Sequence, residues 1–201
     1  MSYYTTTEEV HGVRITIECD THPERQVIDA QDVTVGRPIQ SSRVTWSVDK
    51  WINKLVAGHS TMKIPKIRII FDGVRSDVAR QLVRHTRGFT QSYMESKRPD
   101  LVGAPRPKEP YPCKLILDTT AMGWIEIAKQ RLCTKAMKET RETIMSVVLI
   151  MNTAESNFLK ALAKVSAPPC TWYGACPEEK SCGLVPVKLS VKLKERYENT
   201  L

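Results

Sequence analysis

Residues 66–87, KIRIIFDGVRSDVARQLVRHTR, change from one hydrophobic period to another within 22 positions. The first seven residues, KIRIIFD, predict a strand that ends at Asp72-Gly73, a turn signal. After the turn, Val74, Val78 and Leu82 recur every four positions, which is the spacing of one helix face. The sequence therefore predicts a strand followed directly by a helix that shares its core.

The sequence upstream of this stretch predicts two strands and one helix. HGVRITIECD (11–20) and VIDAQDVTVG (27–36) alternate apolar and polar residues, as half-buried strands do. WSVDKWINKLVAGH (46–59) has helical spacing instead, with Trp51, Leu55 and Val56 on one side. Gly58 follows in a C-cap position, so we expect the helix to end there.

Downstream, the sequence predicts a loop and then helices. RPDLVGAPRPKEPYP (98–112) is rich in proline and has no periodicity, which indicates a loop. From about Trp124 to Val165 the spacing is helical, and we expect one break in this stretch. Strands mixed with helices in irregular order favour the α+β class. We expect a mixed or antiparallel sheet packed with long helices.

Length and charge narrow the class of protein. The chain has 201 residues, the size of a single domain, and we expect a core over 1–165, a cysteine-rich segment over 166–185 and a basic tail over 186–201. A net charge of +8 favours anionic partners. Lys and Arg are spread along the chain, so long nucleic acid is an unfavoured partner. The sequence shows neither a signal peptide nor a long apolar run, and we expect a soluble, cytoplasmic protein.

The most informative motif is the end of the predicted helix. Gln81, Arg84 and His85 stand at positions i, i+3 and i+4, so their side chains share one face. This cationic face fits either an anion-binding site or a solvated helix end, where cations complement the helix dipole. Spacing alone leaves both interpretations open.

The order of motifs around this helix resembles the flavin-dependent thymidylate synthases. In that family a Gly-His motif precedes a strand, and the next helix ends in Gln-x-x-Arg-His-Arg before a loop that closes with Ser-x-Arg. This chain has Gly58-His59, then Gln81-Leu-Val-Arg84-His85, then Ser96-Lys97-Arg98. A later match in spacing comprises Arg131, Ala136, Glu139 and Arg141. The resemblance covers roughly residues 50–183, because some clostridial and phage-like members end in a similar cysteine pattern.

The resemblance implies a flavoprotein that binds FAD and dUMP. Such enzymes methylate C5 of dUMP with methylenetetrahydrofolate as the one-carbon donor and NADPH as the reductant, and they are homotetramers. It implies catalytic roles for Arg131 and Ser96. By the same resemblance, the residues that contact FAD would be His59, Thr61, Arg84, His85 and Arg87, and those that contact the nucleotide would be Gln81, Arg84, Ser96, Arg98 and Arg131.

The chain also departs from the family pattern. Thr86 replaces the second Arg of Arg-His-Arg, Ile64 stands where a Glu is expected, and Met137 stands where a Gln is expected. These changes raise two alternatives. The same scaffold could act on another pyrimidine nucleotide or make a hydroxymethyl product, or the chain could be a nucleotide- or nucleic-acid-binding protein without catalysis. Only Phe89 and Tyr93 would supply the stacking aromatics of a single-strand binder.

The cysteines form a separate pattern. Cys170, Cys176 and Cys182 recur at equal gaps, and Cys133 is a candidate fourth member. Four thiolates can hold Zn²⁺ or an iron–sulfur cluster. The spacing is not the familiar Cys-x2-Cys, so ordinary reduced thiols remain the alternative. We expect Cys19 and Cys113 to be structural.

Overall fold

Five strands pair into one antiparallel sheet, in the order β1-β2-β3-β5-β4. The structure is a computed structural model, and it describes residues 3–39, 44–84, 90–105, 107–187 and 189–190. The order places β3 and β5 in the interior and leaves β1 and β4 at the borders. In chain order the strands are β1 (Tyr3–Val10), β2 (Val13–Asp20), β3 (Lys66–Arg75), β4 (Thr90–Met94) and β5 (Pro112–Thr120).

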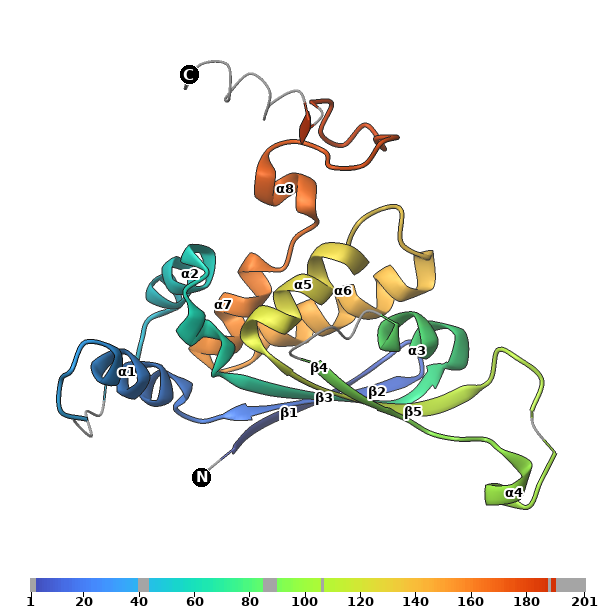
Figure 1. The fold of residues 1–201 in the computed structure, drawn as a ribbon. Helices are drawn as coiled ribbons and strands as arrows, with labels where there is room; N and C mark the ends of the chain where they lie inside the picture. Colours follow the sequence, from blue (N-terminus) through green and yellow to red (C-terminus); the bar gives the residue numbers. More distant parts are fainter. Residues whose placement is uncertain (1–2, 40–43, 85–89, 106, 188, 191–201) are drawn as a thin grey trace.

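Helices cover one face of this sheet, and the opposite face is open (Figure 1). Together they make an α+β protein with a helical layer on an antiparallel sheet, as the sequence predicts. The helices are α1 (Pro23–Thr34), α2 (Val48–Ala57), the short 3₁₀ helix η1 (Ser60–Lys63), α3 (Ser76–Val83), α4 (Pro99–Val102), α5 (Ala121–Arg131), α6 (Lys138–Thr153), α7 (Asn157–Val165) and α8 (Pro169–Tyr173).

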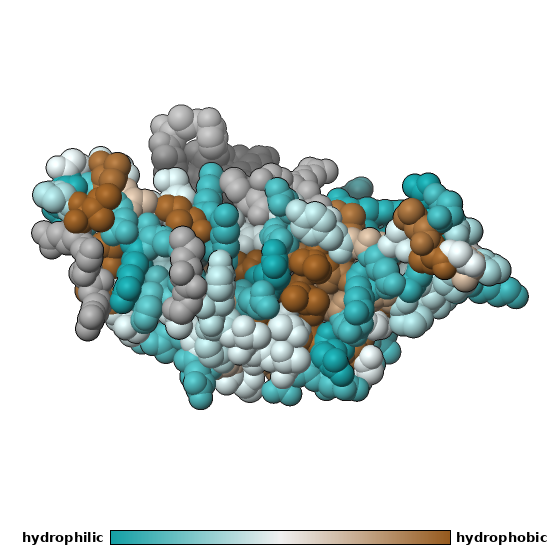
Figure 2. Space-filling view, turned by 90° about the horizontal axis from the view of Figure 1, so that it is seen from below, coloured by the Kyte–Doolittle hydropathy of each residue, from teal (hydrophilic) through white to brown (hydrophobic). Residues whose placement is uncertain are grey.

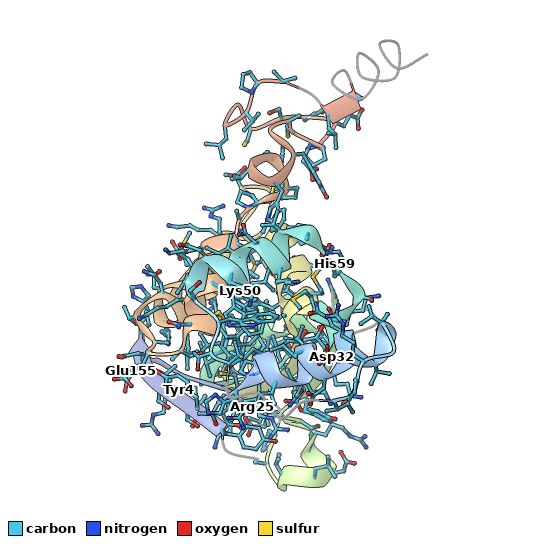
Figure 3. All side chains as sticks on the ribbon, turned by 90° about the vertical axis from the view of Figure 1, so that its left-hand side faces the viewer. Tyr4, Arg25, Asp32, Lys50, His59 and Glu155 are labelled. Atoms are coloured by element: carbon cyan, nitrogen blue, oxygen red, sulfur yellow. The ribbon has the colours of Figure 1, made fainter. Side chains whose placement is uncertain are left out.

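The core lies between the sheet and the helices. Residues of alternate positions in β2, β3 and β5 are buried on the helical side, and Ile69 and Leu117 face one another across the central strand pair. Trp51 of α2 packs against Phe158 of α7, with ring centroids 4.8 Å apart. At the sheet border, the hydroxyl oxygen of Tyr4 accepts a 2.9 Å hydrogen bond from the backbone N–H of Glu155 (Figure 3). The two layers are thus joined by apolar packing and by a polar contact at the rim.

Several elements agree with the sequence-based expectations. The strand expected over 11–20 is β2, and the helix expected over 46–59 is α2. Gly58 is its C-cap and has the left-handed backbone conformation, with φ of 65°. The helix that follows β3 is α3. No helix of the described ranges combines the length and the apolar character needed to cross a membrane.

Other elements correct those expectations. The strand expected over 27–36 is wrong, because this segment belongs to α1; Pro23 in its first turn is preorganised for a helix, and Glu24 there complements the dipole. The stretch from Trp124 to Val165 is broken twice, after Arg131 and after Thr153. At the second break the hydroxyl of Ser156 caps α7.

The strand expected to stop at Asp72-Gly73 instead continues to Arg75 through a bulge. Gly73 lies at the bulge with φ of +91°, and a Cβ there would lie 3.1 Å from the carbonyl oxygen of Gly12. Gly58 also has positive φ, but a Cβ there would meet nothing within 4 Å. The two glycines therefore differ in their surroundings and share a backbone conformation that disfavours other residues.

We expect Gly73→Ala to lower the free energy of unfolding by about 2–3 kcal/mol, because backbone strain adds to a steric contact. Gly58→Ala, the matched control, carries the backbone strain without the contact and should lower it by about 1 kcal/mol. Urea unfolding of both variants measures the difference. Equal losses of unfolding free energy in the two variants would show that the contact with Gly12 does not contribute to the destabilisation.

Candidate functional site

Arg131 ends α5 and is buried, with only 6% of its surface exposed. Its guanidinium donates a hydrogen bond to the backbone carbonyl oxygen of Gln81 in α3. The Nε atom is also buried, and it has no hydrogen-bond partner among the described residues. A buried guanidinium with a single carbonyl acceptor is incompletely satisfied.

Arg84, at the exposed C-cap of α3, is near enough to this guanidinium for the two charges to interact. Burial, and then the charge of Arg84, lower the pKa of Arg131 below its ordinary value. In the ranges that the structure describes, no carboxylate forms an ion pair with Arg131. Among the described residues, these two cations, one of them buried, therefore have no compensating anion. Such an arrangement favours the binding of an anionic group.

The structure thus brings together three of the residues expected in the site, namely Gln81, Arg84 and Arg131. We refer to them as the arginine cluster. Two further candidates, His85 and Arg87, lie outside the described residues.

His59 and Thr61 lie at the other end of α5. They belong to the η1 region, and the backbone N–H of Ala121, at the start of α5, donates to the carbonyl of Pro65 just after η1. Ten residues of helix separate Ala121 from Arg131, which corresponds to about 15 Å. His59 is exposed at the end of α2 (Figure 3), whereas the hydroxyl oxygen of Thr61 is buried without a partner among the described residues. Within one chain these residues are separate from the arginine cluster.

Ser96 and Arg98 lie in an arm that leaves the sheet after β4. We define the arm as residues 95–111, of which Arg106 is not described; it carries α4 away from the helical layer (Figure 1). The hydroxyl of Ser96 accepts a 3.4 Å bond from the N–H of Arg98, and the guanidinium of Arg98 pairs with Asp100. These contacts stay within the arm, and among the described residues neither Ser96 nor Arg98 has a hydrogen bond or ion pair with the arginine cluster.

The four cysteines Cys133, Cys170, Cys176 and Cys182 line one small cavity of about 20 Å³. The pattern of four candidates therefore converges in space, although they come from the α5–α6 connection and from the C-terminal segment. All six cysteines of the chain are free thiols. Among the described residues, no three Cys, His, Asp or Glu side chains are already grouped tightly enough to hold a metal ion.

Cys19 and Cys113 lie apart from this cavity, in the sheet. Burial raises the pKa of the Cys19 thiol to about 12, and burial also raises the pKa of Cys113. Both side chains are buried with the core residues around them. Their placement agrees with the structural role expected from the sequence.

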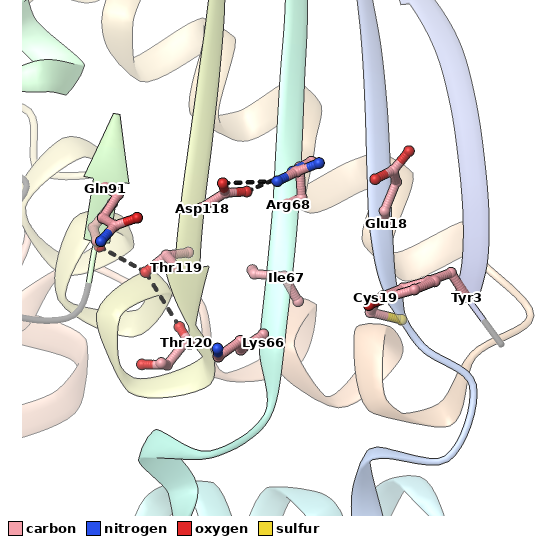
Figure 4. Close-up of a pocket in the computed structure, with 11 residues that line it drawn as sticks. Tyr3, Glu18, Cys19, Lys66, Ile67, Arg68, Gln91, Asp118, Thr119 and Thr120 are labelled. Atoms are coloured by element: carbon pink, nitrogen blue, oxygen red, sulfur yellow. Dashed lines mark hydrogen bonds and ion pairs between the residues drawn. The ribbon is translucent and has the colours of Figure 1, made fainter. Parts of the chain in front are cut away.

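A larger hollow, of about 610 Å³, lies on the open face of the sheet (Figure 4). This face is mostly hydrophilic, with separate apolar spots (Figure 2). Glu18, Arg68, Asp118 and Gln91 are cross-strand neighbours in one row across the hollow. Arg68 donates to both carboxylate oxygens of Asp118, at 2.6 and 2.9 Å, so its charge is already compensated. The larger hollow is therefore less suited to binding an anion than the arginine cluster.

Sequence reasoning missed this hollow. The alternation of charged and apolar residues in Lys66–Asp72 could have indicated one polar sheet face. The sequence did not predict β5, the strand that pairs with β3. The proline-rich stretch before β5 indicated a loop and gave no sign of where a strand begins. Without β5, the pairing of Arg68 with Asp118 could not be foreseen.

Comparisons with known proteins assign neither a family nor a function to the chain. No protein-family model matches the chain, and a search of curated proteins finds no significant match.

The thiols should differ strongly in reactivity. A hydrogen bond from the Thr134 side chain, followed by a backbone hydrogen bond at Leu184, lowers the pKa of the exposed Cys182, so its thiolate forms at lower pH than that of an ordinary thiol. In the chain stripped of metal by a chelator, we expect iodoacetamide at pH 8 to modify Cys182 first and Cys19 last. Peptide mass spectrometry over time measures the order.

Thr134→Val is the control for this experiment, because it removes the hydroxyl and keeps the side-chain shape. It should slow the modification of Cys182 and leave Cys19 unchanged. Labelling of Cys182 and Cys19 at the same rate would contradict the assignment.

Proposed function

We propose that this chain is an FAD-dependent thymidylate synthase-like enzyme with the fold of that family. It would methylate C5 of dUMP, with methylenetetrahydrofolate as the one-carbon donor and NADPH as the reductant. The observation that carries the proposal is the buried, uncompensated guanidinium of Arg131 next to Arg84. The resemblance of the surrounding motifs specifies which anion the cluster would bind.

The arginine cluster has the chemistry that this reaction needs. Attack at C5 of a uracil ring places negative charge on the pyrimidine, and a preorganised cation stabilises that charge best where water is excluded. Arg131, which is buried, suits this role. Arg84 is exposed and suits a phosphate, whose oxygens match the guanidinium fork. The amide of Gln81 would orient the nucleotide by hydrogen bonds.

FAD would supply the redox chemistry and the transfer of the one-carbon unit when bound, and the chain would hold and orient the reactants. His59, Thr61 and Arg84, with His85 and Arg87, are the residues that would contact it. His59 and Arg84 lie at opposite ends of α5 and cannot contact the same ring within one chain. The proposal therefore includes a site assembled from several copies, as in a homotetramer, in which the arms would supply Ser96 and Arg98.

A second candidate is supported by two departures from the family pattern. Met137 is partly buried against the core, and Ile64 is half-buried at the end of η1. Apolar packing thus replaces the two polar side chains that the family pattern has at these positions. The same scaffold could accept a different pyrimidine nucleotide or release a hydroxymethyl product.

A direct experiment tests the proposal and separates the two candidates. The full chain is purified, and the uptake of FAD is followed by its absorbance. It is then incubated with FAD, dUMP, methylenetetrahydrofolate and NADPH, and the nucleotides are analysed by mass spectrometry. Thymidylate supports the first candidate, and a hydroxymethyl nucleotide supports the second.

Two histidine variants provide a matched control for flavin binding. His59→Ala should weaken FAD uptake, whereas His22→Ala, before α1, should leave it unchanged. A protein that takes up no FAD and modifies no nucleotide would contradict both candidates and favour a binding protein without catalysis.

Replacement of Arg131 in the arginine cluster is expected to weaken ligand binding without lowering the stability of the fold. Arg131→Met replaces a buried cation by an apolar side chain of similar length. We expect dUMP affinity to fall by about 100-fold, while the free energy of unfolding without ligand stays equal or rises by up to about 2 kcal/mol. Calorimetric titration with dUMP and urea unfolding measure the two effects.

Arg25→Met is the control, because Arg25 is exposed on α1, which lies on the opposite side of the molecule from α3 (Figure 1). It should change neither quantity. If Arg131→Met unfolds the protein and binding cannot be measured, Arg131→Lys keeps the charge and tests the shape of the guanidinium alone. Unchanged dUMP affinity in a folded Arg131 variant would refute the role of the cluster.

A further inference from the structure

The C-terminal lobe, which we define as residues 166–190 without Lys188, stands away from the sheet and its helices (Figure 1). Its buried side chains are few: Cys170, Ala175 and Cys176. Trp172 joins the lobe to the helical layer by two contacts. Its Nε1 donates a 3.1 Å hydrogen bond to the carbonyl of Val165, and Lys129 lies over its ring. A unit this small cannot bury enough apolar surface for stability on its own, and such units commonly depend on a metal or on disulfides.

The backbone of the lobe folds into a closed loop. The N–H of Cys176 donates to the carbonyl of Val187 at 2.8 Å, and the N–H of Leu189 donates to the carbonyl of Cys176 at 2.9 Å. These bonds join the two ends of the segment that contains Cys182. Inside the loop, the hydroxyl of Ser181 accepts from the N–H of Gly183 at 3.1 Å. The loop is thereby shaped so that Cys182 returns towards the α5–α6 connection, where its thiol contacts Thr134.

Four of the six thiols of the chain consequently surround one cavity. Cys170 comes from α8, Cys176 and Cys182 come from the two parts of the closed loop, and Cys133 comes from the connection after α5. The cavity, of about 20 Å³, exceeds the roughly 10–15 Å³ that a single water molecule requires. It therefore has room for one ion.

We propose that Cys133, Cys170, Cys176 and Cys182 bind a single Zn²⁺ ion that fastens the C-terminal lobe to the end of α5. Four thiolates in tetrahedral geometry form a structural zinc site, and such a site contributes directly to folding. The proposal is independent of the nucleotide site.

Binding requires the four thiols to turn into the cavity, because no three of the described side chains are yet arranged around an ion. Each thiol loses its proton to solvent as its sulfur binds the metal. Zn²⁺ with four thiolates carries net negative charge. Lys135 lines the cavity and offsets this charge, whereas Glu178, which also lines it, opposes it.

The test uses the full chain, purified without oxygen from cells supplied with zinc. Elemental analysis should find one zinc per chain. After exchange, Co²⁺ should give the absorption of a tetrahedral thiolate complex. Cys176→Ser and Cys133→Ser should each reduce zinc affinity by about tenfold or more, measured by competition with a chromophoric chelator. Cys113→Ser removes a thiol outside the cavity and should retain one zinc.

A second variant covers the case in which a buried cysteine cannot be replaced without unfolding. Cys182 is exposed, so Cys182→Ser should stay folded while its zinc affinity falls. Removal of zinc from the native chain should also make residues 166–190 more sensitive to limited proteolysis. The proposal is overturned if the folded chain holds no zinc and all of its thiols titrate as free, if iron and sulfide are found instead, or if intact mass shows a disulfide among these four cysteines.

Discussion

The antiparallel pairing of β3 with β5 determines where every other element lies. Their buried residues, such as Ile69 opposite Leu117, form the floor of the core. Each strand also leads directly into a helix: α3 follows β3 at Arg75, and α5 follows β5 at Thr120. Because the strands run in opposite directions, the two helices start from opposite ends of the sheet and return towards each other (Figure 1). A different register would shift both helices.

This geometry explains why Gln81 and Arg131, fifty residues apart in the sequence, come into contact. A strand pair of about ten residues is roughly 33 Å long, and α3 and α5 cover about 12 and 16 Å of that length. Their C-terminal ends therefore meet near the middle of the sheet. Helix C-termini carry about half a negative charge each, which helps to hold Arg84 and Arg131 in place. The two termini only partly balance two full positive charges, and the balance favours an incoming anion.

The sequence was most informative where one local signal dominated, and it failed where tertiary packing decides. Gly58 marked the end of α2, because a left-handed C-cap favours glycine. The pattern over 27–36 was misleading, because α1 buries Pro23, Glu24 and Val27, which follow helical spacing and lie mostly before the alternating stretch. In the candidate site, residue types could be predicted but their distances could not. Contact between Gln81 and Arg131 depends on strand register, and the separation of His59 from them follows from the direction of α5. The four candidate cysteines line one cavity only because the folded lobe lies against the α5–α6 connection.

The border strand β1 has a consequence for how the protein behaves at high concentration. Within the described part of the chain it pairs with β2 alone, so its outer row of amide and carbonyl groups could template the addition of a foreign strand. Its threonines and the adjacent carboxylates of Glu8 and Glu9 keep that row hydrated and negatively charged. The eight-residue strand can therefore stay exposed in a chain that is otherwise strongly cationic, with little tendency to start a fibril.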